Sequence, residues 1–256
     1  MRPVLLIILF LLFTCNLPAQ RTREVQVQNQ FWWSINTNIK IANKWSILAD
    51  FHNRRTNFFA NTNFFFLRLG AAYKINEQIS VASGAGQLWL ANRSGATEFF
   101  SNETRLYQQL QLGHTIGQSA LNNTFRIEER WQQKVVNGTL TDVYRYSTRF
   151  RYQIALNIPV SKKKYVPSIA IADEILLQAG KDIIYNSFDQ NRLFAGIKQQ
   201  ITPTLSFDAG YMLVYQQRLS GYQYNRNHTM RLFFYWKPLL KKKQQTKSTA
   251  FHLTEE

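Results

Sequence analysis

Hydrophobic and polar residues alternate along almost the whole chain beyond residue 20. The clearest run covers residues 144–158, where Phe150 and Ile154 belong to an apolar series at even positions and Arg149 and Arg151 to a polar series at odd positions. Successive residues of a β-strand point to opposite sides, so each run has one apolar and one polar face. Similar runs occupy residues 31–41, 45–54, 65–75, 205–216 and 230–236. The pattern predicts an all-β fold of antiparallel strands.

The length of these runs and the spread of apolar residues indicate a membrane protein. Many runs exceed about ten residues, whereas strands of soluble proteins have about 5–6 residues and a tilted membrane strand needs about 9–11. Hydrophobic residues make up 45% of the chain, yet beyond residue 20 no apolar run approaches the ~20 residues of a membrane-spanning helix. Apolar residues that alternate with polar ones are typical of the lipid-facing surface of a transmembrane β-barrel.

A soluble periplasmic sandwich or a lipocalin-like barrel is the main alternative fold, because its aromatic faces would form a core. The chain has 19 Phe, 12 Tyr and 6 Trp residues, and its long strands carry more bulky apolar surface than one small barrel can bury. We therefore expect an antiparallel transmembrane β-barrel in the outer membrane of a Gram-negative bacterium.

The connections between the runs suggest how the barrel is built. Short ones at 42–44, 76–78, 114–119, 159–164 and 202–203 alternate with longer polar ones at 53–61, 92–101, 133–142, 178–187 and 218–225. Such barrels have short periplasmic turns and longer outer loops, and their strand number is usually even. Because the pattern gives about eleven strands, we expect twelve, with an extra strand from residues 24–30, or alternatively ten.

The N-terminus resembles a secretory signal. Arg2 precedes an apolar run of about ten residues, within the usual range of about 7–15 and too short to span a membrane. Cleavage after Ala19 divides the chain into a signal peptide at 1–19, a barrel at 20–238 and a charged tail at 239–256. The single cysteine, Cys15, falls in the removed peptide. The mature chain then has no disulfide, no thiol metal site and no thiol nucleophile.

The formal net charge is +16, which in a cytosolic protein would suggest a nucleic-acid partner. Export argues against nucleic acid. The expected partners are instead outer-membrane lipid and, during insertion, the barrel-assembly and periplasmic chaperone machinery. The oligomeric state stays open.

Many charged residues fall on the polar, inward faces of the predicted strands. An arginine that faces lipid at the bilayer midplane costs about 2–4 kcal/mol, so these charges belong in the lumen. The basic residues expected there are Arg54, Arg68, Arg105, Arg126, Arg130, Arg145, Arg149, Arg151, Arg192, Lys198 and Arg231. The acidic ones are Glu103, Glu128, Glu174 and Asp208.

Two interpretations of this charged lumen follow. In the first, arginines and carboxylates pair across neighbouring strands and fill a narrow, structural barrel, each pair contributing about 0.2–1 kcal/mol. In the second, the surplus of basic residues lines a pore that favours anions, as rings of Arg or Lys do in channels. The sequence leaves both open.

Several ordered motifs resemble a known family. They are the Trp-rich first strand, Trp45 leading to Asn53-Arg54-Arg55, the segment 103–109, the Arg126/Glu128/Arg130 alternation, Asn191-Arg192 and Gly210-Tyr211. Together they resemble a domain-of-unknown-function family of Gram-negative outer-membrane β-barrels over nearly the whole mature chain. The resemblance implies the barrel fold and carries no activity.

An enzyme is the other class to consider, such as a lipase- or protease-like enzyme at the barrel rim. The chain has 4 histidines, and none lies in a Gly-x-Ser-x-Gly or His-Glu-x-x-His context. His52 and Asp50 on one face form the best pair, which we interpret as ordinary lumen residues. We therefore expect no catalysis, no cofactor and no metal.

The tryptophans are expected to anchor the barrel at the membrane–water interfaces. Those near the ends of predicted strands are Trp32, Trp33, Trp45, Trp131 and Trp236.

Overall fold

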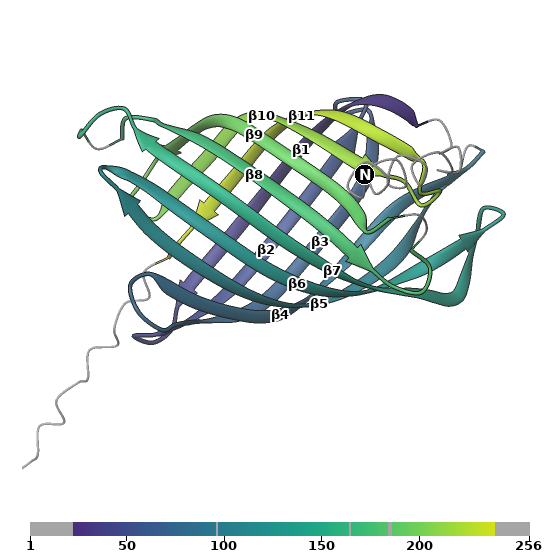
Figure 1. Ribbon diagram of the computed structural model, residues 1–256, viewed down its shortest axis with the longest axis horizontal. Coiled ribbons are helices and arrows are strands. Elements are labelled where there is room, and N and C mark those ends of the chain that lie inside the picture. Colours follow the sequence, from purple (N-terminus) through teal and green to yellow (C-terminus); the bar gives the residue numbers. More distant parts are fainter. Residues whose placement is uncertain (1–22, 96, 164, 184–185, 239–256) are drawn as a thin grey trace, which may run out of the picture.

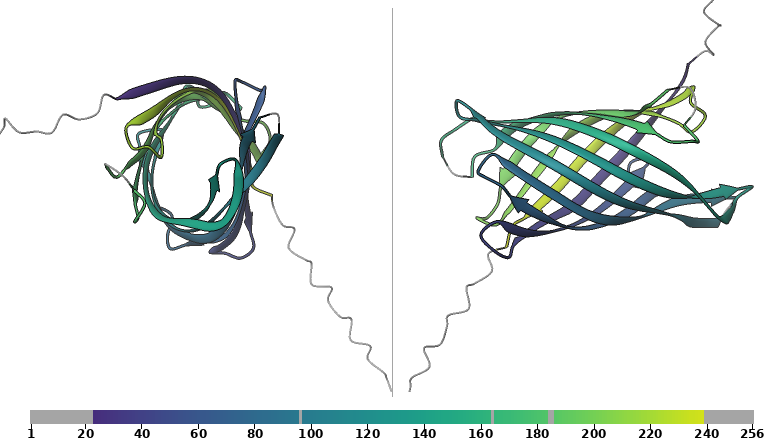
Figure 2. Two further views of the ribbon diagram at one scale, coloured as in Figure 1. Left: turned by 90° about the vertical axis from the view of Figure 1, so that its right-hand side faces the viewer. Right: turned by 60° about the horizontal axis from the view of Figure 1, so that its bottom comes forward.

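The alternating runs form long antiparallel strands that close into a barrel. The computed structural model describes residues 23–95, 97–163, 165–183 and 186–238. Figure 1 shows this part of the chain from the side, and the left view of Figure 2, along the barrel axis, shows one closed ring of strands. The expected signal peptide at 1–19 and the tail at 239–256 lie outside the described residues.

The strands follow one another around the ring in sequence order. They are β1 (Glu24–Lys40), β2 (Trp45–Thr56), β3 (Asn61–Lys74), β4 (Ile79–Ser94), β5 (Thr97–Ile116), β6 (Ser119–Val136), β7 (Thr139–Pro159), β8 (Ser168–Ala179), β9 (Phe188–Gln200), β10 (Leu205–Gln217) and β11 (Gln223–Trp236). In this part of the chain no helix is long and apolar enough to cross a membrane.

The barrel has eleven strands in its described residues, so the expected twelve, and the alternative ten, are wrong. Residues 24–30 do not form a separate strand but are the first part of β1. Each hairpin reverses the chain direction, so an odd number of strands leaves β1 and β11 running the same way. They pair in parallel, from Glu24 opposite Gln223 to Thr37 opposite Trp236. The start of β1 and the end of β11 therefore lie at opposite ends of the barrel (Figure 1).

The connections also differ from the expected alternation of short turns and long loops. Residues 92–101 and 133–142 pair almost to their tips, where Ser94 lies opposite Thr97 and Val136 opposite Thr139. At the second tip Asn137 and Gly138 have φ angles of 51° and 75°, the left-handed geometry that an Asn-Gly hairpin turn requires. Instead of loops, β6 and β7 extend past the rim as a hairpin (Figure 1).

The two faces of the barrel have opposite character. Large apolar side chains are exposed on the outside, among them Leu67, Leu69, Phe125, Ile127, Ile171, Ile197 and Met230. Inside, one side of the barrel holds a buried apolar cluster of Trp32, Ala170, Ala172, Phe194, Met212 and Val214.

Trp32 was expected to anchor the barrel at a membrane–water interface, and this expectation is wrong. Its side chain is 3% exposed and lies inside the barrel. Neighbouring strand residues point to opposite faces, so Trp32 and Trp33 cannot both face outward. Trp33 lies against Phe51 with ring centroids 5.5 Å apart, and Trp45 is 48% exposed.

A glycine pair shapes the inner wall between β3 and β4. Gly70 and Gly84 lie opposite each other, and the ring of Tyr107 from β5 covers both. A Cβ atom on Gly70 would overlap the Tyr107 hydroxyl, and one on Gly84 would overlap the Leu69 carbonyl. The aromatic ring of Tyr107 occupies the space in which side chains at Gly70 and Gly84 would lie.

Candidate functional site

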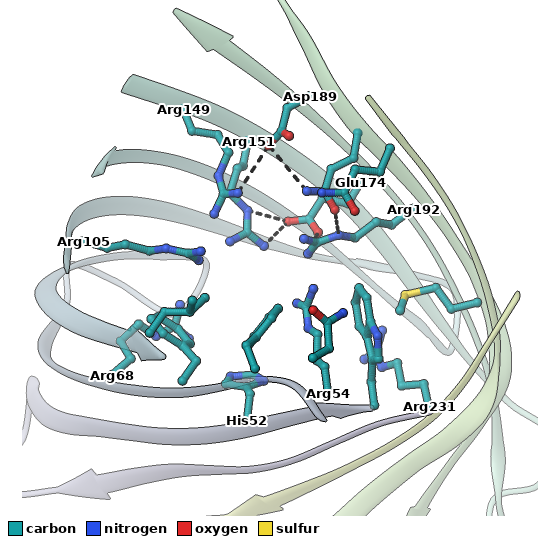
Figure 3. A pocket seen from close by; sticks show the side chains of 18 of the residues that line it. His52, Arg54, Arg68, Arg105, Arg149, Arg151, Glu174, Asp189, Arg192 and Arg231 are labelled. Atoms are coloured by element: carbon teal, nitrogen blue, oxygen red, sulfur yellow. Dashed lines mark hydrogen bonds and ion pairs between the residues drawn. The ribbon is translucent and has the colours of Figure 1, made fainter. Parts of the chain in front are cut away.

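A cavity of about 330 Å³ lies within the barrel. Figure 3 shows His52, Arg54, Arg68 and Arg231 on one wall, built by β2, β3 and β11. Arg149, Arg151, Glu174, Asp189 and Arg192 form the facing wall, on β7, β8 and β9. These side chains meet because the inward positions of neighbouring strands are in register.

The facing wall is a continuous chain of ion pairs. Arg151 bridges two carboxylates, with Nη1 2.6 Å from Glu128 Oε1 and Nη2 2.5 Å from Glu174 Oε1. Glu174 also binds Arg192, at 2.9 Å from Oε2 to Nη1. Arg149 binds Glu128 and reaches Asp189, with Nη1 3.3 Å from Oδ2. The Arg149 and Glu128 side chains are each only 4% exposed. Removal of either partner would therefore leave the other as an uncompensated buried charge.

Two arginines share the Glu103 carboxylate of β5: Arg105 from the same strand and Arg130 from β6. Arg105 Nε and Arg130 Nε each lie 2.7 Å from Glu103 Oε1.

Separate pairs complete the opposite wall. Arg68 binds Asp50, which lies directly opposite it on β2. Arg231 Nη2 lies 2.8 Å from Asp208 Oδ2, and the Tyr235 hydroxyl donates to the same oxygen at 2.7 Å.

Arg54 differs from the other arginines of the cavity. It has no ion pair among the described residues. Its guanidinium carbon lies 3.3 Å from the ring centroid of Trp32 and 4.5 Å from that of Phe64. Its Nε is shielded from solvent and has no hydrogen-bond partner in the described part of the chain.

His52 does not form a pair with Asp50. The Asp50 carboxylate is bound by Arg68, whereas the His52 ring packs 5.8 Å from the Phe66 ring and 5.6 Å from the Phe233 ring, centroid to centroid. Among the described residues no group of three or more His, Cys, Asp or Glu could hold a metal ion.

Comparison with protein families gives one family match. The family described as "Protein of unknown function (DUF2490)" matches residues 29–226. The chain belongs to this family. The resemblance to a family of unknown function noted in the sequence is thereby confirmed.

Comparison of this DUF2490 member with individual proteins gives no functional assignment. No curated protein matches its sequence. Among solved structures, the beta domain of the Bordetella autotransporter BrkA is similar, with a TM-score of 0.40 and 9% sequence identity over 71% of this chain and 81% of that chain. A TM-score this low carries no functional conclusion, and the barrel described above follows from the strand pairing of this DUF2490 chain itself.

The structure brings most of the expected lumen residues of this DUF2490 barrel to one cavity. Those that line it are Arg54, Arg68, Arg105, Arg126, Arg130, Arg149, Arg151, Arg192, Arg231, Glu103 and Glu174. Glu128 and Asp208 lie behind the lining arginines and bind them. Arg145 binds Gln132 instead, and Lys198 Nζ lies 4.9 Å from the Tyr235 ring centroid. Neither of these two lines the cavity.

Sequence reasoning missed other lining residues. Asp189 and Gln190 follow a segment expected to be a loop, so their inward positions at the start of β9 had no clear alternation before them. Trp32 was expected at the membrane interface, and the aromatic residues Phe64 and Phe66 were assigned to no face, yet all three line the cavity. Their positions relative to inward Gln30 and Arg68 could have revealed them, since residues two apart share a face.

Proposed function

We propose that this protein is an outer-membrane β-barrel with a pore-like, net-basic lumen that admits small anionic solutes. Catalysis is not part of the proposal. We also infer that the barrel-assembly and periplasmic chaperone machinery brings the chain into the membrane, as the β-barrel and the expected signal peptide require.

The membrane location rests on the inverted distribution of side chains. Leu67 is 41% exposed and Leu69 55% on the outside of the barrel, while the ion pairs lie inside. Exposed apolar surface of this extent is rare on soluble monomers and marks contact with lipid or protein. Two carboxylates, Glu129 and Asp173, interrupt the outer face, and Asp173 Oδ1 accepts a hydrogen bond from Asn191 Nδ2 at 2.7 Å. Acidic residues are the less costly charges on a lipid-facing surface.

The preference for anions rests on the balance of charge around the cavity. Nine arginines line it, against Glu103, Glu174 and Asp189. Asp50, Glu128 and Asp208 add three carboxylates as partners of those arginines. The guanidinium groups therefore outnumber the carboxylates even when every pair is complete. This surplus is the observation that carries the proposal, because rings of basic side chains favour anions.

A closed, structural barrel is the second candidate. A separate cavity of about 290 Å³ lies toward the turns that follow β1 and β3, and it shares no lining residue with the first. The apolar cluster around Trp32 also fills part of the interior. Both features favour a lumen that is divided along its length.

Planar-bilayer recordings test the two candidates. The purified, folded barrel is added to a bilayer across a KCl gradient, with heat-unfolded protein as the control. A reversal potential of the sign for chloride selectivity is expected. A cation-selective current would contradict the basic pore, and an absence of conductance in bilayers that contain the protein would favour the closed barrel.

A further inference from the structure

Arg54 is a partly buried cation without a counter-charge from the described residues. The other eight arginines that line the cavity each bind a carboxylate, whereas Arg54 has no ion pair among the described residues. Removing a charge from water without pairing it is costly. A group held in this way has a strong preference for an anion that reaches it.

The two aromatic contacts decide how Arg54 can bind. Trp32 and Phe64 lie directly opposite Arg54 on the two neighbouring strands. Their ring centroids are 3.3 Å and 4.5 Å from its central carbon, so aromatic rings flank the guanidinium on both sides. Donors of a guanidinium lie in its plane and form a rigid fork that matches carboxylate and phosphate oxygens. The flanking rings therefore leave the terminal edge of the guanidinium for a ligand. Arg54 lines the cavity, and its two Nη groups donate no hydrogen bond to the described residues, whereas its Nε is shielded from solvent.

A second guanidinium lies close to the same ring. The central carbon of Arg192 is 5.4 Å from the Trp32 ring centroid. The Trp32 indole is held in place because its Nε1 donates to Gln30 Oε1 at 2.7 Å. Arg192 already binds Glu174 on the facing wall. Arg54 is thus the member of this group that is available to a ligand, and Arg192 adds positive potential beside it.

The size of the cavity limits the ligand. Its volume of about 330 Å³ lies at the lower end of the range of about 300–1,000 Å³ for small-molecule sites. A solute of a few heavy atoms beyond its anionic group fits, whereas a polymer does not.

We propose that Arg54 is the recognition residue for a small oxyanion, a carboxylate or phosphate solute, held edge-on against the Trp32–Arg54–Phe64 stack. The inference rests on the proposed function in one respect, since the solute must enter through the lumen.

Stabilisation by ligand tests the proposal without requiring conduction. The heat-denaturation midpoint of the folded barrel in detergent is measured with increasing succinate or phosphate, with chloride replaced to keep ionic strength constant. A ligand that binds only the folded state raises this midpoint as its concentration exceeds the dissociation constant. The wild-type barrel should be stabilised by one or both oxyanions over chloride, and the comparison distinguishes the carboxylate from the phosphate.

Three variants locate the effect. Arg54→Met keeps a long side chain for the stack and should weaken binding at least about tenfold, a loss typical of charged hydrogen bonds. Arg54→Lys keeps the charge but loses the fork, and it should weaken binding by less. Arg93→Gln removes a positive charge from an exposed site that donates to Asn61, and it should bind as the wild type does. A difference in migration between the unheated and the heated protein on a denaturing gel checks that each variant is folded.

The outcomes separate this inference from the proposed function. Stabilisation that persists in Arg54→Met, or no stabilisation of the wild type by either oxyanion, overturns the role of Arg54. Chloride currents are measured on the same proteins. Oxyanion binding that depends on Arg54 in a barrel that conducts no chloride would overturn the pore and leave the binding site.

Discussion

Arg126 donates hydrogen bonds to the side chain of Gln109, with its Nε 2.9 Å from Oε1. Arg126 lines the larger cavity and Gln109 lines the smaller one toward the turns. The pair thus joins the walls of the two cavities. Arg126 is further held by Glu128, at 3.5 Å, and by the Tyr107 ring, at 5.3 Å from its centroid.

Opening this pair should connect the two cavities. Gln109→Ala removes the acceptor and the bulk of the side chain, so single-channel conductance should rise by about twofold or more if a constriction there limits flux. The measurement is the planar-bilayer current at fixed KCl. Gln108→Ala, one residue away on the outer face, is the matched control and should leave the current unchanged. An equal current in Gln109→Ala and the control would place the constriction elsewhere.

The pair of neighbouring glutamates Glu128 and Glu129 offers a test of the ion-pair chain. Glu128 binds Arg149 and Arg151 and also contacts Arg126, so Glu128→Gln leaves three guanidinium groups of the barrel interior with a weaker partner. Breaking a buried pair on one side costs about 3–5 kcal/mol, and the free energy of unfolding should fall by about that amount. Urea unfolding of the barrel in lipid vesicles measures it.

Glu129→Gln is the control for this prediction. Its side chain points to the other face, and a surface change of this kind should alter stability by less than about 0.5 kcal/mol. Similar losses in the two variants would mean that the chain of pairs contributes no more than an exposed carboxylate.

A substitution at Leu69 should show whether the outer face is in contact with lipid. Leu69 lies in the middle of β3, opposite Ala49 and Ala85, and is 55% exposed. Leu69→Arg should destabilise a membrane-embedded barrel by about 2–4 kcal/mol. In a soluble barrel the same change would be almost neutral, because the site already faces solvent.

Val143→Arg is the matched control for Leu69→Arg. Val143 is 56% exposed on the part of β7 near the hairpin that passes the rim. Unfolding in lipid vesicles should show little change for this variant. If both arginines are tolerated equally, the outer face of β3 does not contact hydrocarbon.

The parallel pairing of β1 and β11 can be tested by a disulfide. Ile35 lies opposite Phe234 across this pair, so Ile35→Cys with Phe234→Cys should form a cross-link on oxidation, detected as a shift in gel mobility. Ile35→Cys with Met230→Cys, four residues out of register, should not. Cross-linking in the second pair alone would contradict the register described here.

Sequence reasoning recovered the faces of the strands but not their partners. Arg54 and Arg149 were placed inward because side-chain alternation is a local property that can be read along one strand. The sequence places Asp50 on the same face as His52, its neighbour on the same strand, whereas the structure pairs Asp50 with Arg68. Directly opposed residues on adjacent strands have Cβ atoms about 4.5–5.5 Å apart. They are therefore closer than residues two apart on one strand. Sequence alone does not show which residues are opposed.

The number of strands was missed for a related reason. The pairing of β1 with β11 joins residues about 200 positions apart, and no local pattern records it. The rule that such barrels have an even number of strands then favoured the wrong total. The Asn137-Gly138 turn, by contrast, was available as a strong local hairpin signal between two strand-forming segments. It was overlooked because polar residues around it suggested a loop.

The parallel pairing of β1 with β11 determines on which sides of a membrane the two ends of the barrel would lie. With an odd number of crossings, Arg23 at the start of β1 and Lys237 beyond β11 come to opposite sides of the bilayer. A reagent confined to one compartment would then reach only one of these two positions. In a barrel with an even number of crossings it would reach both or neither.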